Sequence, residues 1–250
     1  MNTVERFSNR VANYIKYRPG YPGEIVAYLA EHTGLVKDHI IADIGCGPGQ
    51  SARPFLENGN RVIGVEPNEA MREAVSQCLA EFANFAVVDG SSTATNLESS
   101  SVDFVVAAQA FHWFDPGPTR AEFERILRPD GWCVLMWNER QLGTTPFLNE
   151  YENLLLKYAK DYAAVRHENI HQGRLADFFQ SEYDRARFDN FQDFDFDGLK
   201  GRLLSSSYMP AETDATAPAM LDELRSLFAK HNENGRIKIL YDTNVYFSRL

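Results

Sequence analysis

Three glycines at alternate positions follow a short apolar run, residues 40–44, that contains Asp43. The glycines are Gly45, Gly47 and Gly49. Glycine allows tight turns with positive φ and lets backbone N–H groups approach a ligand closely. Dinucleotide-binding turns read G-x-G-x-x-G and phosphate loops read G-x-x-x-x-G-K-[ST], whereas this segment reads D-x-G-x-G-x-G with no following lysine. Because an acid ahead of the glycines repels a pyrophosphate, the segment favours a ligand with positive charge.

A second acid follows the next apolar run. Residues 61–66 end in Glu66, about 20 residues beyond the first glycine, where nucleotide-binding units place a carboxylate against ribose hydroxyls. A third apolar run, residues 85–88, is followed by Asp89 and Gly90. The three runs predict buried strands whose ends carry the polar groups of one site.

The elements that must position these residues alternate along the chain. We predict strands at residues 40–44, 61–66, 85–88, 102–107 and 132–137, and helices at 25–32 and from about residues 50, 68 and 118. This alternation indicates right-handed βαβ crossovers and a mostly parallel sheet. Further on, the pattern predicts helices within 144–186, a strand at 187–196, helices at 199–206 and 220–231, and a last strand at 237–247.

These landmarks together resemble the class I S-adenosylmethionine-dependent methyltransferases over residues 40–138, and within them the small-molecule type similar to trans-aconitate methyltransferases. The segments 102–114 and 125–136 look like that family's fourth strand with its loop, and its helix end, turn and fifth strand. The resemblance implies an α/β, Rossmann-like sheet, mostly parallel, with an antiparallel C-terminal edge strand and an inserted helical cap.

The resemblance also divides the chain into four segments. Residues 1–38 are expected to form a helical leader and lid, and residues 39–140 the cofactor-binding core. Residues 141–186 are expected to form a helical substrate cap, and residues 187–250 the strands and helices that complete sheet and cap.

The same resemblance implies S-adenosylmethionine as cofactor. Glu66 would accept hydrogen bonds from the ribose hydroxyls, Asp89 would accept one from the adenine amino group beside Pro67, and Asp43 would lie near the methionine ammonium. An arginine in the leader, Arg18, would pair with the methionine carboxylate or with a substrate carboxylate. The expected cofactor-binding residues are Asp43, Gly45, Cys46, Gly47, Gly49, Glu66, Pro67, Asp89, Gly90, Gln109 and Arg18.

Catalytic and substrate residues are expected in the aromatic segment 109–114 and near the chain's tyrosines. His112 is the candidate general base because its pKa can lie near neutrality. Tyr14, Trp113 and Tyr208 are the candidate substrate contacts. The alternatives are that the aromatic side chains only pack the next helix, that His112 is structural and that Arg18 is a solvated surface residue.

Composition limits the other possibilities. A net charge of −10 over 250 residues argues against a nucleic-acid partner. Three widely separated cysteines predict reduced thiols. Because no apolar run reaches about 18 residues and the first residues lack the apolar core of a signal peptide, we expect no membrane span, no signal peptide and a cytoplasmic protein. We expect the protein to be a monomer or a homodimer. Residues 167–171 match the zinc-protease pattern H-E-x-x-H, but no third ligand is evident, so no metal is expected.

We therefore predict a methyltransferase that acts on a small molecule, by O-methylation of a carboxylate or a hydroxyl. A carboxylate needs no general base, whereas a hydroxyl makes His112 the base. The alternatives are a catalytically inactive S-adenosylmethionine-binding module and, with less support, a nicotinamide-dependent oxidoreductase, which a different glycine spacing would favour.

Overall fold

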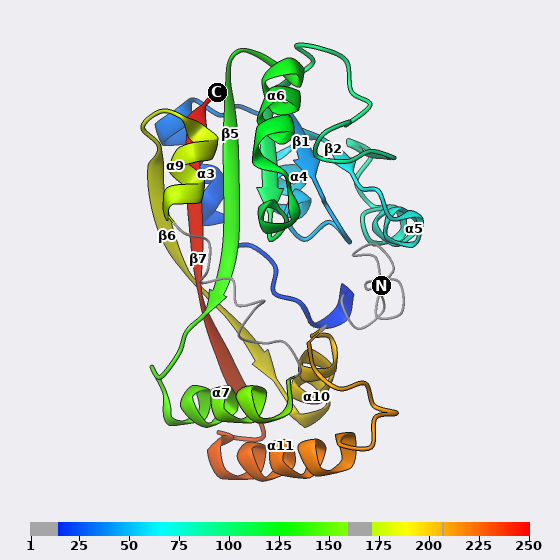
Figure 1. Cartoon of the computed structure of the whole chain (residues 1–250), viewed down its shortest axis with the longest axis vertical. Helices are drawn as coiled ribbons and strands as arrows, with labels where there is room; N and C mark the ends of the chain where they lie inside the picture. Colours follow the sequence, from blue (N-terminus) through cyan, green and yellow to red (C-terminus); the bar gives the residue numbers. More distant parts are fainter. Residues whose placement is uncertain (1–14, 160–171, 207) are drawn as a thin grey trace. The chain divides into compact units, whose positions relative to one another are not determined.

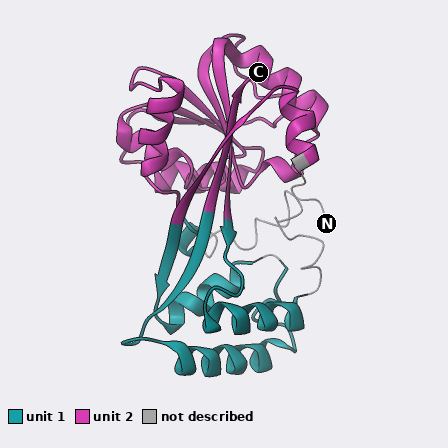
Figure 2. Cartoon of the chain, turned by 90° about the vertical axis from the view of Figure 1, so that its left-hand side faces the viewer, with its two compact units in different colours: residues 1–19, 139–169, 190–242 teal, residues 20–138, 170–189, 243–250 magenta. Residues whose placement is uncertain are grey.

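The computed structural model describes residues 15–159, 172–206 and 208–250. These residues form two compact units, each built from three stretches of chain (Figure 2). Unit 1 takes the described parts of 1–19, 139–169 and 190–242, and unit 2 those of 20–138, 170–189 and 243–250. These boundaries fall inside the four segments expected from the sequence, so the assignment of a lid and a cap stays a prediction.

A seven-stranded sheet has the strand order β3-β2-β1-β4-β5-β7-β6 (Figure 1). Its strands are β1 (Ile40–Ile44), β2 (Arg61–Val65), β3 (Phe85–Val88), β4 (Val102–Ala108), β5 (Leu127–Arg140), β6 (Asp184–Phe194) and β7 (Ile237–Arg249). The helices are α3 (Glu24–Thr33), α4 (Ala52–Asn58), α5 (Glu69–Cys78), the 3₁₀ turn η1 (Phe111–Trp113), α6 (Pro116–Ile126), α7 (Pro146–Tyr158), α9 (Gln172–Phe179), α10 (Phe196–Leu204) and α11 (Ala217–His231).

The first five strands run parallel. β1 pairs with β2 and with β4, β2 pairs with β3, and β4 pairs with β5, all in parallel register. Parallel strands covered on both faces are near-continuous apolar runs, as in the sequence Ile40–Ile44 of β1. The predicted mostly parallel sheet with an antiparallel edge is confirmed.

In unit 2, helices cover both faces of the sheet. Successive strand residues point to opposite faces, so Ile41 and Phe104 pack in one cluster with α3 and α4. Ala42 and Val105 pack in a second cluster with α6 and α9. Because β1 to β5 pair in parallel, their carboxyl ends all lie at the same edge of this three-layer unit.

Unit 1 has a separate apolar core. Leu148 of α7, Leu203 of α10, Leu224 of α11 and Ile239 of β7 are buried together in it. The two helices α7 and α10 start at side-chain caps: the Thr145 hydroxyl accepts from the N–H of Leu148, and Asp195 caps α10 in the same way.

The predicted elements agree in kind with those observed, with shifted ends. β1 and β3 have their predicted bounds, whereas β5 begins at Leu127, earlier than the predicted residue 132. Pro129 and Gly131, which resemble a turn, are part of that strand. Within the residues that the structure describes, no helix is long and apolar enough to cross a membrane.

Candidate functional site

The glycine loop follows β1 and turns back on itself through residues in the left-handed region. Gly45, Gly47 and Gly49 have φ of 70°, 50° and 87°. A Cβ on Gly45 would stand 2.9 Å from the Ala110 Cβ, and one on Gly49 would stand 2.6 Å from Leu79 Cδ1. A Cβ on Gly47 would meet no atom within 4 Å. Gly45 and Gly49 are thus required by packing, whereas Gly47 leaves its backbone open to a ligand.

Asp43 is a carboxylate buried at the end of β1, with 1% of its surface exposed. Its Oδ2 accepts a hydrogen bond of 2.6 Å from the hydroxyl of Ser51. Its Oδ1 is buried and has no hydrogen-bond partner in the described part of the chain. Burial raises the pKa of Asp43 from 3.8 to about 7, the Ser51 hydrogen bond opposes that rise, and the nearby Glu66 adds to it. A buried carboxylate oxygen without a partner is unfavourable, and a donor or a cation from a ligand would satisfy it.

Glu66 ties the glycine loop to the start of α5. Its Oε2 accepts from the N–H of Gly47 and its Oε1 from the N–H of Asn68, both at 3.0 Å. Burial raises the pKa of Glu66, while these two N–H groups and Arg72 oppose the rise. Because each carboxylate oxygen can accept two hydrogen bonds, both retain capacity for a ligand hydroxyl.

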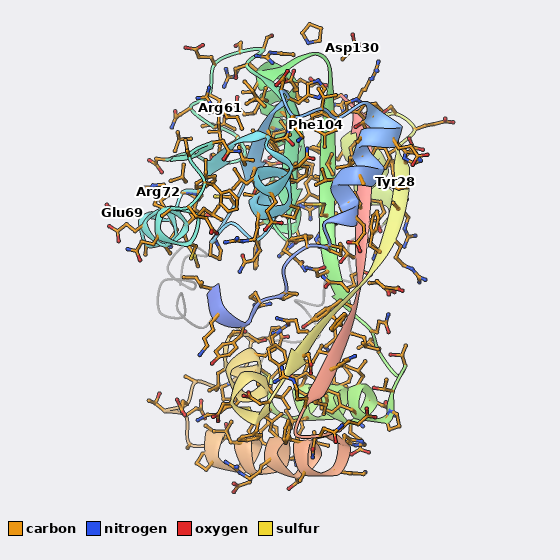
Figure 3. All side chains as sticks on the ribbon, turned by 180° about the vertical axis from the view of Figure 1, so that it is seen from behind. Tyr28, Arg61, Glu69, Arg72, Phe104 and Asp130 are labelled. Atoms are coloured by element: carbon orange, nitrogen blue, oxygen red, sulfur yellow. The ribbon has the colours of Figure 1, made fainter. Side chains whose placement is uncertain are left out.

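Asp89 follows β3 and is bound to α5 through Arg72. Arg72 Nη1 lies 2.8 Å from Asp89 Oδ1 and donates to the carbonyl of Glu66 at 2.9 Å. The Asp89 side chain is 69% exposed and Pro67 is also exposed. Gly90 is required by packing, since a Cβ there would stand 2.7 Å from the carbonyl oxygen of Thr95. Figure 3 labels Arg72 on its helix.

Gln109, at the end of β4, has a positive φ of 53°, which is uncommon for a residue other than glycine. Its Nε2 donates to the carbonyl of Asn138 at 2.8 Å, and its N–H donates to that of Met136 at 2.9 Å. Its Oε1 is buried and has no hydrogen-bond partner among the residues described. Strained backbone at such a position is typical of binding sites.

The aromatic segment after β4 divides into packed and exposed side chains. Phe111 is fully buried and Arg174 lies over its ring, with Arg174 Nη2 donating to the carbonyl of Phe114 at 2.7 Å. Trp113 is 46% exposed, and its ring centroid is 4.7 Å from that of His112. Phe111 is thus a core residue, and Trp113 is accessible to a ligand.

The cysteine of the glycine loop is not a nucleophile. The Cys46 side chain is buried, and a Cβ on Gly64 would stand 2.7 Å from its Sγ. Burial, together with the charges of Asp43 and Glu66, raises the pKa of the thiol well above its ordinary value. Cys46 therefore contributes its backbone and its packing.

Most of the predicted site residues lie in unit 2 at the carboxyl ends of neighbouring parallel strands. Asp43 and the glycines follow β1, Glu66 and Pro67 follow β2, Asp89 and Gly90 follow β3, and Gln109, His112 and Trp113 follow β4. This edge is where open α/β sheets bind ligands. The arrangement holds two buried carboxylates beside backbone N–H groups, which suits a ligand with hydroxyls and a positive charge.

The remaining predicted residues lie elsewhere. Arg18 and Tyr208 belong to unit 1, where Arg18 Nη2 donates to the carbonyl of Ser205 at 3.3 Å. Tyr14 and the H-E-x-x-H segment, residues 167–171, lie outside the described residues. In the portion that is described, no three His, Cys, Asp or Glu side chains are placed to hold a metal ion.

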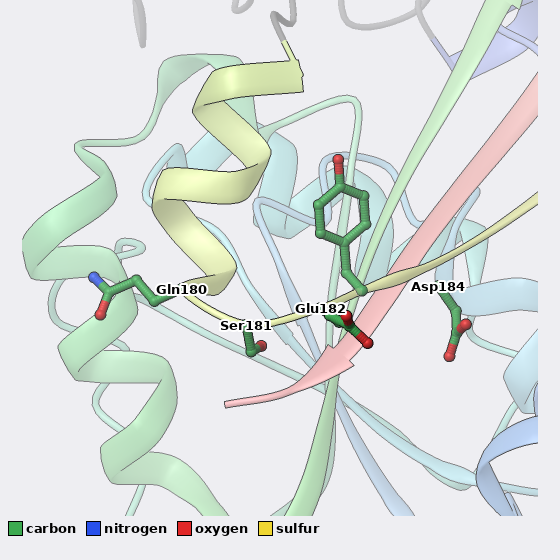
Figure 4. Close-up of a pocket in the computed structure, with 5 residues that line it drawn as sticks. Gln180, Ser181, Glu182 and Asp184 are labelled. Atoms are coloured by element: carbon green, nitrogen blue, oxygen red, sulfur yellow. The ribbon is translucent and has the colours of Figure 1, made fainter.

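A surface hollow of about 680 Å³ lies in the connection between α9 and β6 (Figure 4). It is lined by Gln180, Ser181, Glu182, Tyr183 and Asp184, none of them among the predicted site residues. In the close-up, the labelled Gln180, just after α9, and Asp184, at the start of β6, lie well apart and do not converge on a common point. The hollow therefore lacks convergent polar groups.

Sequence reasoning missed three partners of the site. Ser51 holds Asp43, Arg72 connects Glu66 with Asp89, and Arg174 holds the segment after β4. Ser51 could have been found, because a serine at a helix start is a typical N-cap residue and lies beside the loop. The two arginines carry no local signal, since their contacts come from tertiary packing.

The known proteins that are similar to this chain are described as methyltransferases. The family model described as a methyltransferase domain matches residues 42–135. An uncharacterised methyltransferase-like protein of Schizosaccharomyces pombe is 27% identical over 253 residues, covering 98% of this chain and 95% of that protein. An uncharacterised methyltransferase of Mycobacterium bovis is 32% identical over 146 residues, covering 58% of this chain and 57% of that protein. The chain thus matches almost all of the first relative and little more than half of the second.

Among solved structures, one described as "a Putative Type II Methyltransferase from Anaeromyxobacter dehalogenans" has a TM-score of 0.71 to this chain. It is 20% identical and covers 93% of this chain and 98% of its own. At this identity the likeness is one of fold alone.

Proposed function

We propose that the chain, which matches the methyltransferase family model and its relatives, is a class I S-adenosylmethionine-dependent methyltransferase that transfers a methyl group from S-adenosylmethionine to an oxygen of a small molecule. The observation that carries the proposal is the pair of neighbouring buried carboxylates, Asp43 and Glu66, of which Glu66 accepts a hydrogen bond from the N–H of Gly47. This donor and acceptor set matches a nucleoside with a cationic amino-acid group.

The residues of unit 2 fit this cofactor. Glu66 is held by two backbone N–H groups and keeps acceptor capacity for both ribose hydroxyls. Asp43 Oδ1, buried without a partner in the described structure, suits the methionine ammonium, directly or through a water molecule. Pro67 and Asp89 are exposed after β2 and β3. There Pro67 would lie beside the adenine, and Asp89 would accept a hydrogen bond from its amino group.

When bound, the cofactor supplies a methyl group on a positively charged sulfur, which is already a good leaving group. The chain's own residues then have to bind the cofactor and the acceptor, orient them and exclude water, so catalysis depends on proximity and alignment. Trp113 offers an exposed aromatic face that can attract a cation. Gln109 fixes the backbone after β4 through its hydrogen bonds to β5.

The acceptor is a carboxylate or a hydroxyl. A carboxylate is already a nucleophile and requires only positioning, which Arg18 can supply. A hydroxyl requires a base to take its proton, and His112 in η1 is the candidate. We assign Trp113, Tyr208 and Tyr14 to substrate contact, and the helical segments after residue 140 to enclosing the acceptor.

Calorimetric titration with S-adenosylmethionine and with S-adenosylhomocysteine tests the proposal. Both should bind, and Glu66→Gln should weaken both about tenfold or more, because charge-assisted hydrogen bonds to the ribose are lost. Glu69→Gln, on an exposed residue of α5, is the matched control and should bind as the unaltered protein does.

Three outcomes separate the alternatives. Failure of both ligands to bind contradicts the proposed function. Binding without turnover over a panel of small acids and phenols would favour an inactive cofactor-binding module. Saturable binding of NADH in place of the two sulfur compounds would favour an oxidoreductase.

A further inference from the structure

Arg202, on α10 in unit 1, carries a buried guanidinium that has no acidic partner among the residues that the structure describes. The residue is 7% exposed. Its Nε donates to the hydroxyl of Tyr241 at 3.1 Å and its Nη1 to that of Ser206 at 3.0 Å. In the described part of the chain no carboxylate lies within 4.0 Å of it. A buried charge is unfavourable unless it is paired, so the missing anion needs a physical explanation.

The orientation of this guanidinium is fixed by a chain of hydrogen bonds. The hydroxyl of Tyr241 donates a hydrogen bond to Gln192 Oε1 at 2.9 Å, and Gln192 Nε2 donates to the carbonyl of Tyr17 at 3.0 Å. The Tyr17 ring lies on α10, since a Cβ on Gly201 would stand 2.1 Å from it. Within the described structure, Arg202 is therefore held by neutral groups, which orient the guanidinium and do not neutralise its charge.

A neighbouring arginine shows the contrast. Arg140 is partly buried and forms an ion pair with Glu152, and both side chains are about one-tenth exposed. Arg140 also lies over the ring of Tyr151. Glu152 is thus the ion-pair partner of Arg140 and not of Arg202. The electrostatic neighbours of Arg202 are the tyrosines Tyr151, Tyr208 and Tyr241.

The guanidinium keeps donors for a ligand. Of the five N–H groups of an arginine, two are used by Tyr241 and Ser206, which leaves three. The two Nη atoms form an end-on fork that matches the two oxygens of a carboxylate. A carboxylate would neutralise one positive charge, whereas a phosphate dianion would leave a negative charge buried.

We propose that Arg202 is the anchor of a binding site in unit 1 for a small molecule with a carboxylate, whose remaining surface contacts the surrounding tyrosine rings. That this molecule is the methyl acceptor rests on the proposed function. The site would then narrow the acceptor class to carboxylic acids or to hydroxy compounds that carry an acid group.

The test uses the full-length protein and three probes. Benzoate carries a carboxylate on an aromatic ring, benzamide is its neutral isostere, and inorganic phosphate represents the other common anion. Binding is followed by calorimetry and by the ¹⁵Nε–H resonance of Arg202, assigned by its loss in Arg202→Lys. Tyr241→Phe and the exposed Arg225→Lys, in the same unit, complete the set, and S-adenosylmethionine affinity is measured on every variant.

Benzoate should bind saturably and shift the Arg202 resonance, while benzamide should not bind. Arg202→Lys should weaken benzoate binding about tenfold or more because the fork is lost. Tyr241→Phe should weaken it less, because it only frees the orientation of the guanidinium. Arg225→Lys should bind as the unaltered protein does, and S-adenosylmethionine affinity should be the same in all.

Other results overturn the proposal. Absence of benzoate binding, binding of phosphate in its place, or equal losses in Arg202→Lys and Arg225→Lys would each do so. If Arg202→Lys does not fold, the resonance is identified from Tyr241→Phe, and its failure to move with benzoate is the contradicting result. If the unaltered protein binds benzoate but not S-adenosylmethionine, the proposed function is contradicted, whereas the carboxylate site at Arg202 is supported.

Discussion

Replacing Asp43 with asparagine should make the protein without its cofactor more stable at neutral and alkaline pH. Asparagine has the shape of the protonated acid and can still accept from Ser51, but it carries no charge to bury. The pKa of Asp43 is raised from 3.8 to about 7, chiefly by burial. Between these two values the folded protein holds a proton that the unfolded chain has released, so the free energy of unfolding falls as the pH rises.

The slope is about 1.4 kcal/mol for each pH unit in that window. From pH 5 to pH 7 the unaltered protein should therefore lose about 2 kcal/mol of stability through this one group, because the slope falls to half at the folded pKa. D43N lacks this loss. The difference in unfolding free energy between D43N and the unaltered protein should thus grow by about 2 kcal/mol from pH 5 to 7 and level off above pH 8.

Urea unfolding followed by tryptophan fluorescence measures this difference. All three tryptophans, Trp113, Trp132 and Trp137, belong to unit 2, so the signal reports on the unit that contains Asp43. Asp38→Asn, an exposed acid of the same unit, is the control and should leave the pH dependence unchanged. A difference between D43N and the unaltered protein that is the same at every pH would refute the reasoning.

Further variants probe the loop, a salt bridge and the candidate base. Gly49→Ala should destabilise unit 2 by about 2–3 kcal/mol because its Cβ has no room at a φ of 87°, whereas Gly47→Ala, in open space, should cost about 1 kcal/mol, both by urea unfolding. Hydrogen bonds from Arg125 lower the pKa of Glu122 to about 2, opposed by burial. Glu122→Gln should therefore cost about 2–3 kcal/mol at pH 7, a loss that shrinks as the pH falls from 4.5 towards 2. His112→Ala should lower turnover about 10²-fold or more with a hydroxyl acceptor, at unchanged cofactor affinity, and a turnover equal to that of the unaltered protein would exclude it as the base.

The sequence was a good guide where structure is local. The apolar run before Asp43 can only be buried on both faces, and Asn68 is a strong helix cap, so β1 and the start of α5 were predicted closely. The turn signals Pro129 and Gly131 misled the prediction of β5, because β4 also pairs at Leu127, on the far side of a register irregularity that contains both residues.

Partners that come from distant parts of the chain could not be predicted. Nothing in the amphipathic pattern around Arg202 distinguishes a buried arginine from a solvated one, since its environment is made by β7 and by the segment before α10. In the same way, Arg72 reads as an exposed helix residue, although it joins Glu66 to Asp89. The acids and glycines of the site were visible because their chemistry is tied to spacing, whereas the cations that complete it are placed by the fold.

The candidate site collects features that a fold selected for stability alone would not keep. Among the described residues, one buried oxygen of Asp43 and the amide oxygen of Gln109 have no hydrogen-bond partner, Gln109 also has a positive φ, and both residues lie at the carboxyl edge of the parallel strands. Each feature raises the free energy of the protein without its ligand. A cationic ligand that satisfies Asp43 lowers its pKa towards the ordinary value and removes the burial cost, so cofactor binding should release a proton near pH 7 and stabilise unit 2. The same argument applies in unit 1 to Arg202, which has no acidic partner among the described residues and whose charge an acid group of a ligand would neutralise.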